Sequence, residues 1–337
     1  MFEALLYQKL KNGNVRCDVC NHRCLISPGN RGICHVRENQ NGKLYSLVYG
    51  KAIACHIDPI EKKPFFHFMP KTHSLSIATV GCNFRCLCCQ NYEISQNSKF
   101  TKKIEGEDLP PERLVEIAVK NNLPSISYTY TEPTIFLEYA LKTMKLAKER
   151  GIKNNWVTNG YMTKKTLNLI APYLDAANVD LKGFSEVFYQ KYCGGKLRPI
   201  LETLVGMKKR KIWVEVTTLL IPSLNDSEKI LKKIARFIRS QLGPETPWHV
   251  SQFFGSISWQ LQQLPDTPIE TIKKAWEIGK KEGLKYVYSG NIPGHPTEDT
   301  YCPKCKARVI ERTGFAIERY DKSGKCQRCG ESLNIIE

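Results

Sequence analysis

An alternation of short apolar runs with longer amphipathic segments between residues 74 and 288 limits the fold of this chain more than any other feature. The short runs have the length and composition of buried strands, and the longer segments repeat apolar residues at helical spacing. We expect strands at 74–80, 125–130, 155–158, 176–181, 212–220, 248–253 and 286–288, and helices at 111–122, 134–150, 163–172, 196–209, 226–242 and 268–283. Short links between them predict a parallel sheet with helical crossovers. Six or seven such units favour an α/β fold, an incomplete (β/α)6-type TIM-like barrel, over a doubly wound sheet.

A cysteine-rich loop at residues 81–91 follows the first predicted strand. Its Cys82, Cys86 and Cys89 have C-x3-C-x2-C spacing. Thiolates are the usual ligands of iron–sulfur clusters, and a four-iron cluster normally takes four of them. Three ligands leave one iron open to another molecule, as an open position makes a zinc site catalytic. Cys88 could compete as a ligand, but the spacing favours Cys89.

Polar residues recur where the predicted strands end. Glu132 follows the second strand, while Asp180 and Lys182 lie at the end of the fourth. His249 lies on a later strand, nearer its start. In β/α barrels the chemistry is placed at the carboxyl ends of the strands. We therefore expect these side chains around the cysteine loop.

An N-terminal group of four cysteines lies in a loop-rich segment, where residues 1–12 are expected to form a short helix. The group consists of Cys17, Cys20, Cys24 and Cys34. A segment this short buries little apolar area, so it needs an additional stabilising element such as a bound metal. Zn²⁺ bound by four thiolates and a second iron–sulfur cluster both fit, with zinc slightly favoured.

A C-terminal group of four cysteines forms two C-x2-C pairs separated by twenty residues. The group consists of Cys302, Cys305, Cys326 and Cys329. This pattern is typical of a zinc ribbon, and rubredoxin-type iron would fit the same spacing. We therefore expect three regions: a Cys-rich N-terminal region at 1–70, the barrel at 71–295 and a four-cysteine zinc-ribbon-like module at 296–337.

The composition limits where in the cell the protein is expected and which classes of partner it is expected to bind. The start of the chain lacks the features of a signal peptide, and no apolar run is long enough to span a membrane. Twelve of the fourteen cysteines fall into three groups, which indicates metal or catalysis in a reducing cytoplasm, and lone Cys55 and Cys193 are expected as small buried residues. The net charge of +17 favours a solvated lysine-rich surface over a nucleic-acid partner.

The cysteine loop resembles the signature of the radical SAM superfamily, in which the open iron binds S-adenosylmethionine (SAM). The chain further resembles the AmmeMemoRadiSam system radical SAM enzyme family over nearly all of its length. The resemblance is carried by the N-terminal cysteine pattern and by segments 58–64, 81–86, 128–134, 247–249, 290–294 and 300–305. In their barrel, those proteins are similar to pyruvate formate-lyase activating enzyme.

The resemblance implies that the three loop cysteines hold a [4Fe-4S] cluster. It implies SAM contacts for Asp180 and Lys182, which match an Asp-Leu-Lys motif, and for His249. Glu132 stands where related enzymes have a Gly-Gly-Glu turn, although Tyr130 and Thr131 replace the glycines. Each of these residues could instead form a hydrogen bond or ion pair within the barrel mouth.

The resemblance also implies reductive cleavage of SAM to a 5′-deoxyadenosyl radical that abstracts hydrogen from a substrate. The electron donor would be a ferredoxin or flavodoxin. The favoured hypothesis is modification of a small molecule, RNA or protein, with AMMECR-like and Memo-like protein partners. The alternatives are a glycyl-radical enzyme activase and, from another class, a zinc-ribbon nucleic-acid-binding protein.

Overall fold

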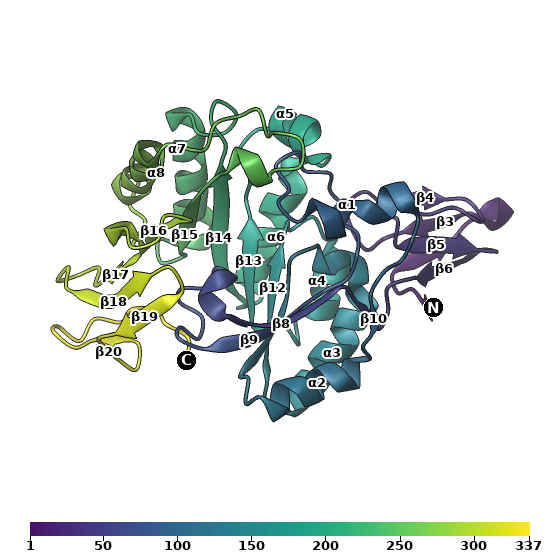
Figure 1. The fold of residues 1–337 in the computed structure, drawn as a ribbon, viewed down its shortest axis with the longest axis horizontal. Coiled ribbons are helices and arrows are strands. Elements are labelled where there is room, and N and C mark those ends of the chain that lie inside the picture. The colour runs from purple at the N-terminus through teal and green to yellow at the C-terminus, as the bar shows by residue number, and fades with distance from the viewer.

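The computed structural model describes residues 1–337, and its centre is an eight-stranded sheet of order β16-β15-β14-β13-β12-β11-β9-β8 (Figure 1). The strands are β8 (Ala54–Pro59), β9 (His73–Ala78), β11 (Ser125–Tyr128), β12 (Lys153–Thr158), β13 (Ala176–Asp180), β14 (Trp213–Leu220), β15 (Trp248–Gln252) and β16 (Val287–Gly290). All neighbours from β9 to β16 pair in parallel, which confirms the predicted parallel sheet. The edge strands β8 and β16 do not pair with each other, so the sheet is open.

Helices connect the parallel strands. They are α1 (Tyr92–Thr101), α2 (Pro111–Lys120), α3 (Leu137–Glu149), α4 (Lys164–Ile170), α5 (Glu186–Phe188), α6 (Leu197–Lys209), α7 (Glu228–Phe237) and α8 (Ile269–Lys281). In α7 the buried Leu231, Ile234 and Ala235 recur at helical spacing, with charged residues on the other face. The six predicted helices are confirmed.

The edge strand β8 is a feature that the sequence analysis missed. It runs antiparallel to β9, with Asp58 opposite Ser74. Pro59 is its last residue. The prolines of segment 58–64 argued against a strand, but an edge strand tolerates proline because it pairs on one side only. Helix α1 was also missed, because its buried positions are the polar Ser95, Gln96 and Ser98 and therefore give no amphipathic pattern.

The N-terminal region forms two small antiparallel sheets at one end of the molecule (Figure 1). One contains β1 (Phe2–Glu3), β6 (Lys43–Ser46) and β5 (Arg37–Gln40), and the other contains β2 (Tyr7–Lys9), β3 (Val15–Cys17) and β4 (Leu25–Ile26). The predicted helix at 1–12 is therefore wrong. Leu6 and Asn12 have positive φ angles of 54° and 57°, which a helix does not accommodate. A third pair, β7 (Lys51–Ala52) with β10 (Glu107–Asp108), lies between this region and the main sheet.

The C-terminal region lies at the opposite end (Figure 1). It contains a sheet of β17 (Thr300–Tyr301), β18 (Arg308–Thr313) and β19 (Ala316–Arg319), followed by the hairpin of β20 (Asp321–Lys322) and β21 (Lys325–Cys326). Buried Arg312 attaches it to the rest of the chain by stacking over Phe66 at 4.2 Å and donating to the Phe66 carbonyl at 3.1 Å.

A buried ion pair attaches the N-terminal region to the main sheet. The Arg37 guanidinium on β5 donates to both carboxylate oxygens of Glu138 on α3, at 3.0 and 2.6 Å. Both side chains are at most 2% exposed. The Leu5 backbone N–H also donates to Glu138, at 2.7 Å. The pair therefore fixes the N-terminal region to α3.

Replacing Arg37 with methionine should destabilise the protein by about 3–5 kcal/mol, because Glu138 is left as an unpaired buried charge. Urea unfolding of the anaerobic protein measures this change. The double variant R37M/E138Q should recover most of the loss, since glutamine removes the charge and still accepts from Leu5. Equal destabilisation of the single and double variants would contradict this account of the pair.

Candidate functional site

The cysteine loop follows the carboxyl end of β9, as predicted, and leads into α1. The backbone N–H of Arg85 donates to the carbonyl of Cys193 at 2.9 Å, and that of Leu87 donates to the carbonyl of Tyr192 at 2.9 Å. The segment after β13 therefore clamps the loop, although it lies about 100 positions further along the chain by its residue numbers. The thiols are positioned by tertiary contacts as well as by their own turn.

The environment of the loop thiols favours thiolate at one position more than at the others. Burial raises the pKa of Cys82 and of Cys89. A hydrogen bond from the Cys193 thiol lowers the pKa of Cys86. The positive charge of nearby Lys182 also lowers this pKa, whereas burial raises it. The positive charge of Lys182 would stabilise the thiolate form that an iron–sulfur cluster needs as its ligand.

The donor set of the loop fits an iron–sulfur cluster. Its three sulfurs are less tightly grouped than those of the C-terminal cysteines, which all lie within 4.8 Å of one another. Lys99 on α1 is close to Cys82 and Cys86, and its ammonium donates to the Phe84 carbonyl at 2.7 Å. Spaced thiols with cations beside them suit a larger group with several metal atoms.

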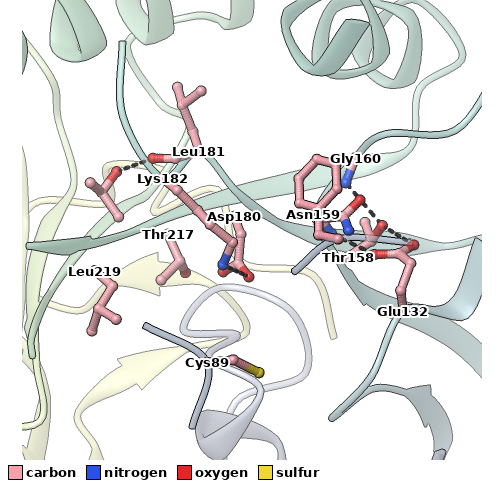
Figure 2. Close-up of polar contacts among 12 residues, drawn as sticks. Cys89, Glu132, Thr158, Asn159, Gly160, Asp180, Leu181, Lys182, Thr217 and Leu219 are labelled. Atoms are coloured by element: carbon pink, nitrogen blue, oxygen red, sulfur yellow. Dashed lines mark hydrogen bonds and ion pairs between the residues drawn. The ribbon is translucent and has the colours of Figure 1, made fainter. Parts of the chain in front are cut away.

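Asp180 and Lys182 lie beside the cysteine loop, as predicted. The Lys182 ammonium donates to Asp180 Oδ2 at 2.7 Å (Figure 2). Burial would lower the pKa of Lys182, but Asp180 and the thiols of Cys86 and Cys88 outweigh it and raise that pKa well above its usual value. The Asp180 side chain is 32% exposed and the Lys182 side chain is 17% exposed, so a ligand can reach both.

Glu132 is buried next to the loop and forms hydrogen bonds only within the protein. Its Oε1 accepts from the Thr158 hydroxyl at 2.8 Å, and its Oε2 accepts from the backbone N–H of Asn159 at 2.8 Å (Figure 2). Burial raises its pKa in spite of these donors. The Asn159 amide in turn donates to Asn83 Oδ1 in the cysteine loop at 2.7 Å. The geometry favours a positioning role, and the SAM contact of Glu132 stays a prediction.

His249 is buried and pairs with another side chain of the sheet. Its Nε2 lies 2.7 Å from Glu215 Oε2, and both side chains are at most 1% exposed. The rings of Phe66 and Tyr288 pack on the imidazole at 4.7 and 5.5 Å. These contacts favour the alternative of a buried hydrogen bond, and a SAM contact for His249 stays a prediction.

Several candidate residues were missed by sequence reasoning. Cys193 was expected to be an ordinary buried residue, yet its thiol contacts Cys86. Buried Lys63 donates to Asp58 Oδ2 at 2.6 Å, and the Tyr130 hydroxyl donates to the same carboxylate. Burial lowers the pKa of Lys63 to about 8 against the opposing effect of Asp58. Segment 58–64, which contains Asp58 and Lys63, was among the segments that carry the family resemblance. Nothing in the sequence linked Cys193 to the cysteine loop.

The two flanking cysteine groups differ in geometry. The four C-terminal sulfurs all lie within 4.8 Å of one another, so that group could hold one metal ion. The four N-terminal cysteines instead line one cavity together with Asn83 and several apolar side chains. Cys55 lies in neither group and is partly buried.

Comparisons with known proteins give consistent matches. The model of the radical SAM superfamily matches residues 76–237. An uncharacterised protein of Methanocaldococcus jannaschii is 47% identical over all of both chains. The pyruvate formate-lyase-activating enzyme of Clostridium pasteurianum is 24% identical over 48% of this chain and 67% of its own.

A solved structure shows the same fold. Streptococcus suis SuiB bound to precursor peptide SuiA matches with a TM-score of 0.51 and 14% identity, over 69% of this chain and 51% of that one. None of the helices combines the length and apolar composition that crossing a membrane requires.

Proposed function

The chain belongs to the radical SAM superfamily, and we propose that Cys82, Cys86 and Cys89 hold a [4Fe-4S] cluster whose open iron binds SAM. When bound, the cluster and SAM supply one-electron cleavage to methionine and a 5′-deoxyadenosyl radical that abstracts hydrogen from the substrate. The observation that carries the proposal is the reachable Asp180–Lys182 pair beside three spaced loop thiols. We take the open parallel sheet as the incomplete barrel that encloses this site.

The residues around the loop have distinct proposed roles. The Lys182 ammonium suits the SAM carboxylate, and the Asp180 carboxylate suits its amino group or a ribose hydroxyl. Glu132 holds Asn159, and through it Asn83 and the cysteine loop, in place.

Asn155 on β12 is a candidate substrate contact. Its side-chain nitrogen and oxygen are both buried without a hydrogen-bond partner. Neighbouring Asn154 donates to the Met144 carbonyl of α3, so Asn155 faces the opposite, inner side of the sheet. Buried polar groups are normally paired, so this amide is a candidate for contact with a group that enters the interior of the barrel.

The K182M variant should bind SAM roughly 10- to 100-fold more weakly, since a hydrogen bond to a charged group contributes about 1.5–3 kcal/mol. Anaerobic calorimetry on the reconstituted protein measures the affinity. The matched control is K191M. It removes an exposed lysine from the segment after β13 that holds the cysteine loop, and it should leave the affinity within twofold of wild type. Equal affinities of K182M and wild type would remove Lys182 from the site.

Two substrate hypotheses remain distinct. We favour a modifying enzyme that acts on a small molecule, RNA or protein with AMMECR-like and Memo-like partners and a ferredoxin or flavodoxin donor. The N-terminal cysteine group supports this choice because it lies against the cysteine loop, whereas the C-terminal module packs on Phe66 and His67. The relative named as a pyruvate formate-lyase-activating enzyme supports the alternative of a glycyl-radical activase.

Deuterium transfer distinguishes the hypotheses. The reconstituted protein is reduced with dithionite and given SAM together with an extract of the host organism grown in deuterated medium. Deuterium should enter 5′-deoxyadenosine from the small-molecule fraction, the RNA fraction or the protein fraction that contains the substrate. Transfer that requires a glycyl-radical enzyme would establish the activase. Salt-dependent nucleic-acid binding without any SAM cleavage would instead favour the zinc-ribbon alternative.

A further inference from the structure

The N-terminal cysteine group lies directly against the cysteine loop. Asn83, the residue after Cys82, lines the same cavity as the four N-terminal cysteines. The Asn83 carbonyl also lies 2.8 Å from His22 Nε2. Both contacts place the group next to the proposed SAM site.

Gly81 marks the point of closest backbone approach. It has a φ of +94°, and a Cβ added there would lie 2.9 Å from the carbonyl oxygen of Cys34. Since neighbouring Cα atoms are about 3.8 Å apart, the thiols of Cys34 and Cys82 are on the order of 10 Å from each other. Lys99 is close enough to both thiols to be affected by their charge. The two cysteine sites therefore share one wall.

The spacing of the N-terminal sulfurs differs from that of a zinc site. With Zn–S bonds of about 2.3 Å, tetrahedral geometry places the sulfurs about 3.8 Å apart. The C-terminal sulfurs gather within 4.8 Å of one another, but the N-terminal sulfurs do not. In this respect they resemble the three sulfurs of the cysteine loop, which form no such group either.

The N-terminal cysteines surround space that a zinc ion would not leave. They line a cavity of about 10 Å³, which is room for a water-sized sphere. Four sulfurs bonded to one central zinc ion would close that space. Apolar Val19, Ile26, Ile33 and Ile135 also line the cavity, together with Gly32 and the polar side chains of His22, Arg37 and Asn83. Its lining of four thiols suits a group that takes four thiolate ligands.

We propose that Cys17, Cys20, Cys24 and Cys34 bind a second iron–sulfur cluster of the four-iron type, directly beside the cysteine loop. Four thiolates are the usual ligand set of such a cluster. Unlike the cluster of the loop, this one has every iron ligated by protein, so it has no open position for SAM. The proposal therefore replaces the zinc that the sequence slightly favoured for this N-terminal group, and the C-terminal group keeps a single metal ion, zinc or iron.

Metal analysis of the full-length, anaerobically reconstituted protein tests the proposal. Wild type should contain about eight iron and eight sulfide per chain, with a single further metal ion at the C-terminal site. The triple variant C82A/C86A/C89A should retain about four iron and four sulfide with the Mössbauer spectrum of a four-iron cluster. It cannot bind the loop cluster, so this result does not depend on SAM cleavage.

The reciprocal variant C20A/C24A should lose about four iron and keep the C-terminal metal ion, while C55A should match wild type. After dithionite reduction, the paramagnetic resonance signal of wild type should be broadened by coupling between neighbouring clusters, and that of the triple variant should not. If C20A/C24A does not fold, the triple variant decides the question alone. About four iron and two zinc in wild type, or a triple variant without iron, would overturn the proposal.

Discussion

The C86A variant will form no 5′-deoxyadenosine above the level of a protein-free control. Cys86 is the central ligand of the proposed cluster, and its thiol has the environment that most favours thiolate. With two ligands left, the loop cannot hold a four-iron cluster, and cleavage of SAM loses its source of electrons. The product is measured by chromatography after reconstitution and reduction with dithionite.

The C55A variant is the matched control for this experiment. Cys55 on β8 is partly buried, and it lies outside all three cysteine groups. Its loss should leave 5′-deoxyadenosine formation and iron content near wild type. C86A should also lose about four iron per chain. Full product formation by C86A would show that Cys86 is no ligand.

Removal of the metal ion from the C-terminal cysteine group will unfold residues 300–337. The buried apolar cluster of this region contains only four residues, Cys302, Val309, Cys326 and Leu333, and two of them are proposed ligands. A structural zinc ion contributes about 10–16 kcal/mol of apparent binding free energy in small domains, which so small a core cannot replace. The variant C305A should therefore lose one metal ion per chain and become sensitive to protease within this region.

Limited proteolysis with mass spectrometry locates the cleavage sites, and K304A is the control. Lys304 lies within the same C-x2-C turn but offers no thiol. Unfolding should also release Arg312 from Phe66, so the thermal midpoint of the remaining protein should fall. A C305A protein that lacks the metal ion and still resists protease would contradict a structural role for this site.

Much of the fold could be predicted because buried parallel strands and amphipathic helices have clear local patterns. The predicted strands and helices from β9 to β16 appear within a few residues of their expected bounds. Strand β8 was missed because Pro59 at its end and its single partner strand weaken the strand pattern. The start of the chain was predicted to be helical from its apolar spacing, but pairing of β2 with β3 overrides that local preference.

The site was only partly predictable from the sequence. The positions of Asp180 and Lys182 beside the cysteine loop follow from the rule that parallel strands end at one edge. The contact of Cys193 with Cys86 depends on a tertiary clamp between segments far apart in the chain, for which a single sequence carries no signal. The distinction between the two flanking cysteine groups likewise depends on sulfur spacing in space.

The central claim is that this chain cleaves SAM with the cluster of its cysteine loop, and a product ratio tests it most directly. Anaerobically reconstituted wild type is mixed with SAM and dithionite, and methionine and 5′-deoxyadenosine are quantified together. The account predicts that both form in equal amounts, and that the triple variant C82A/C86A/C89A forms neither. A protein whose iron and sulfide content shows both clusters in place, but which forms no 5′-deoxyadenosine, would contradict it.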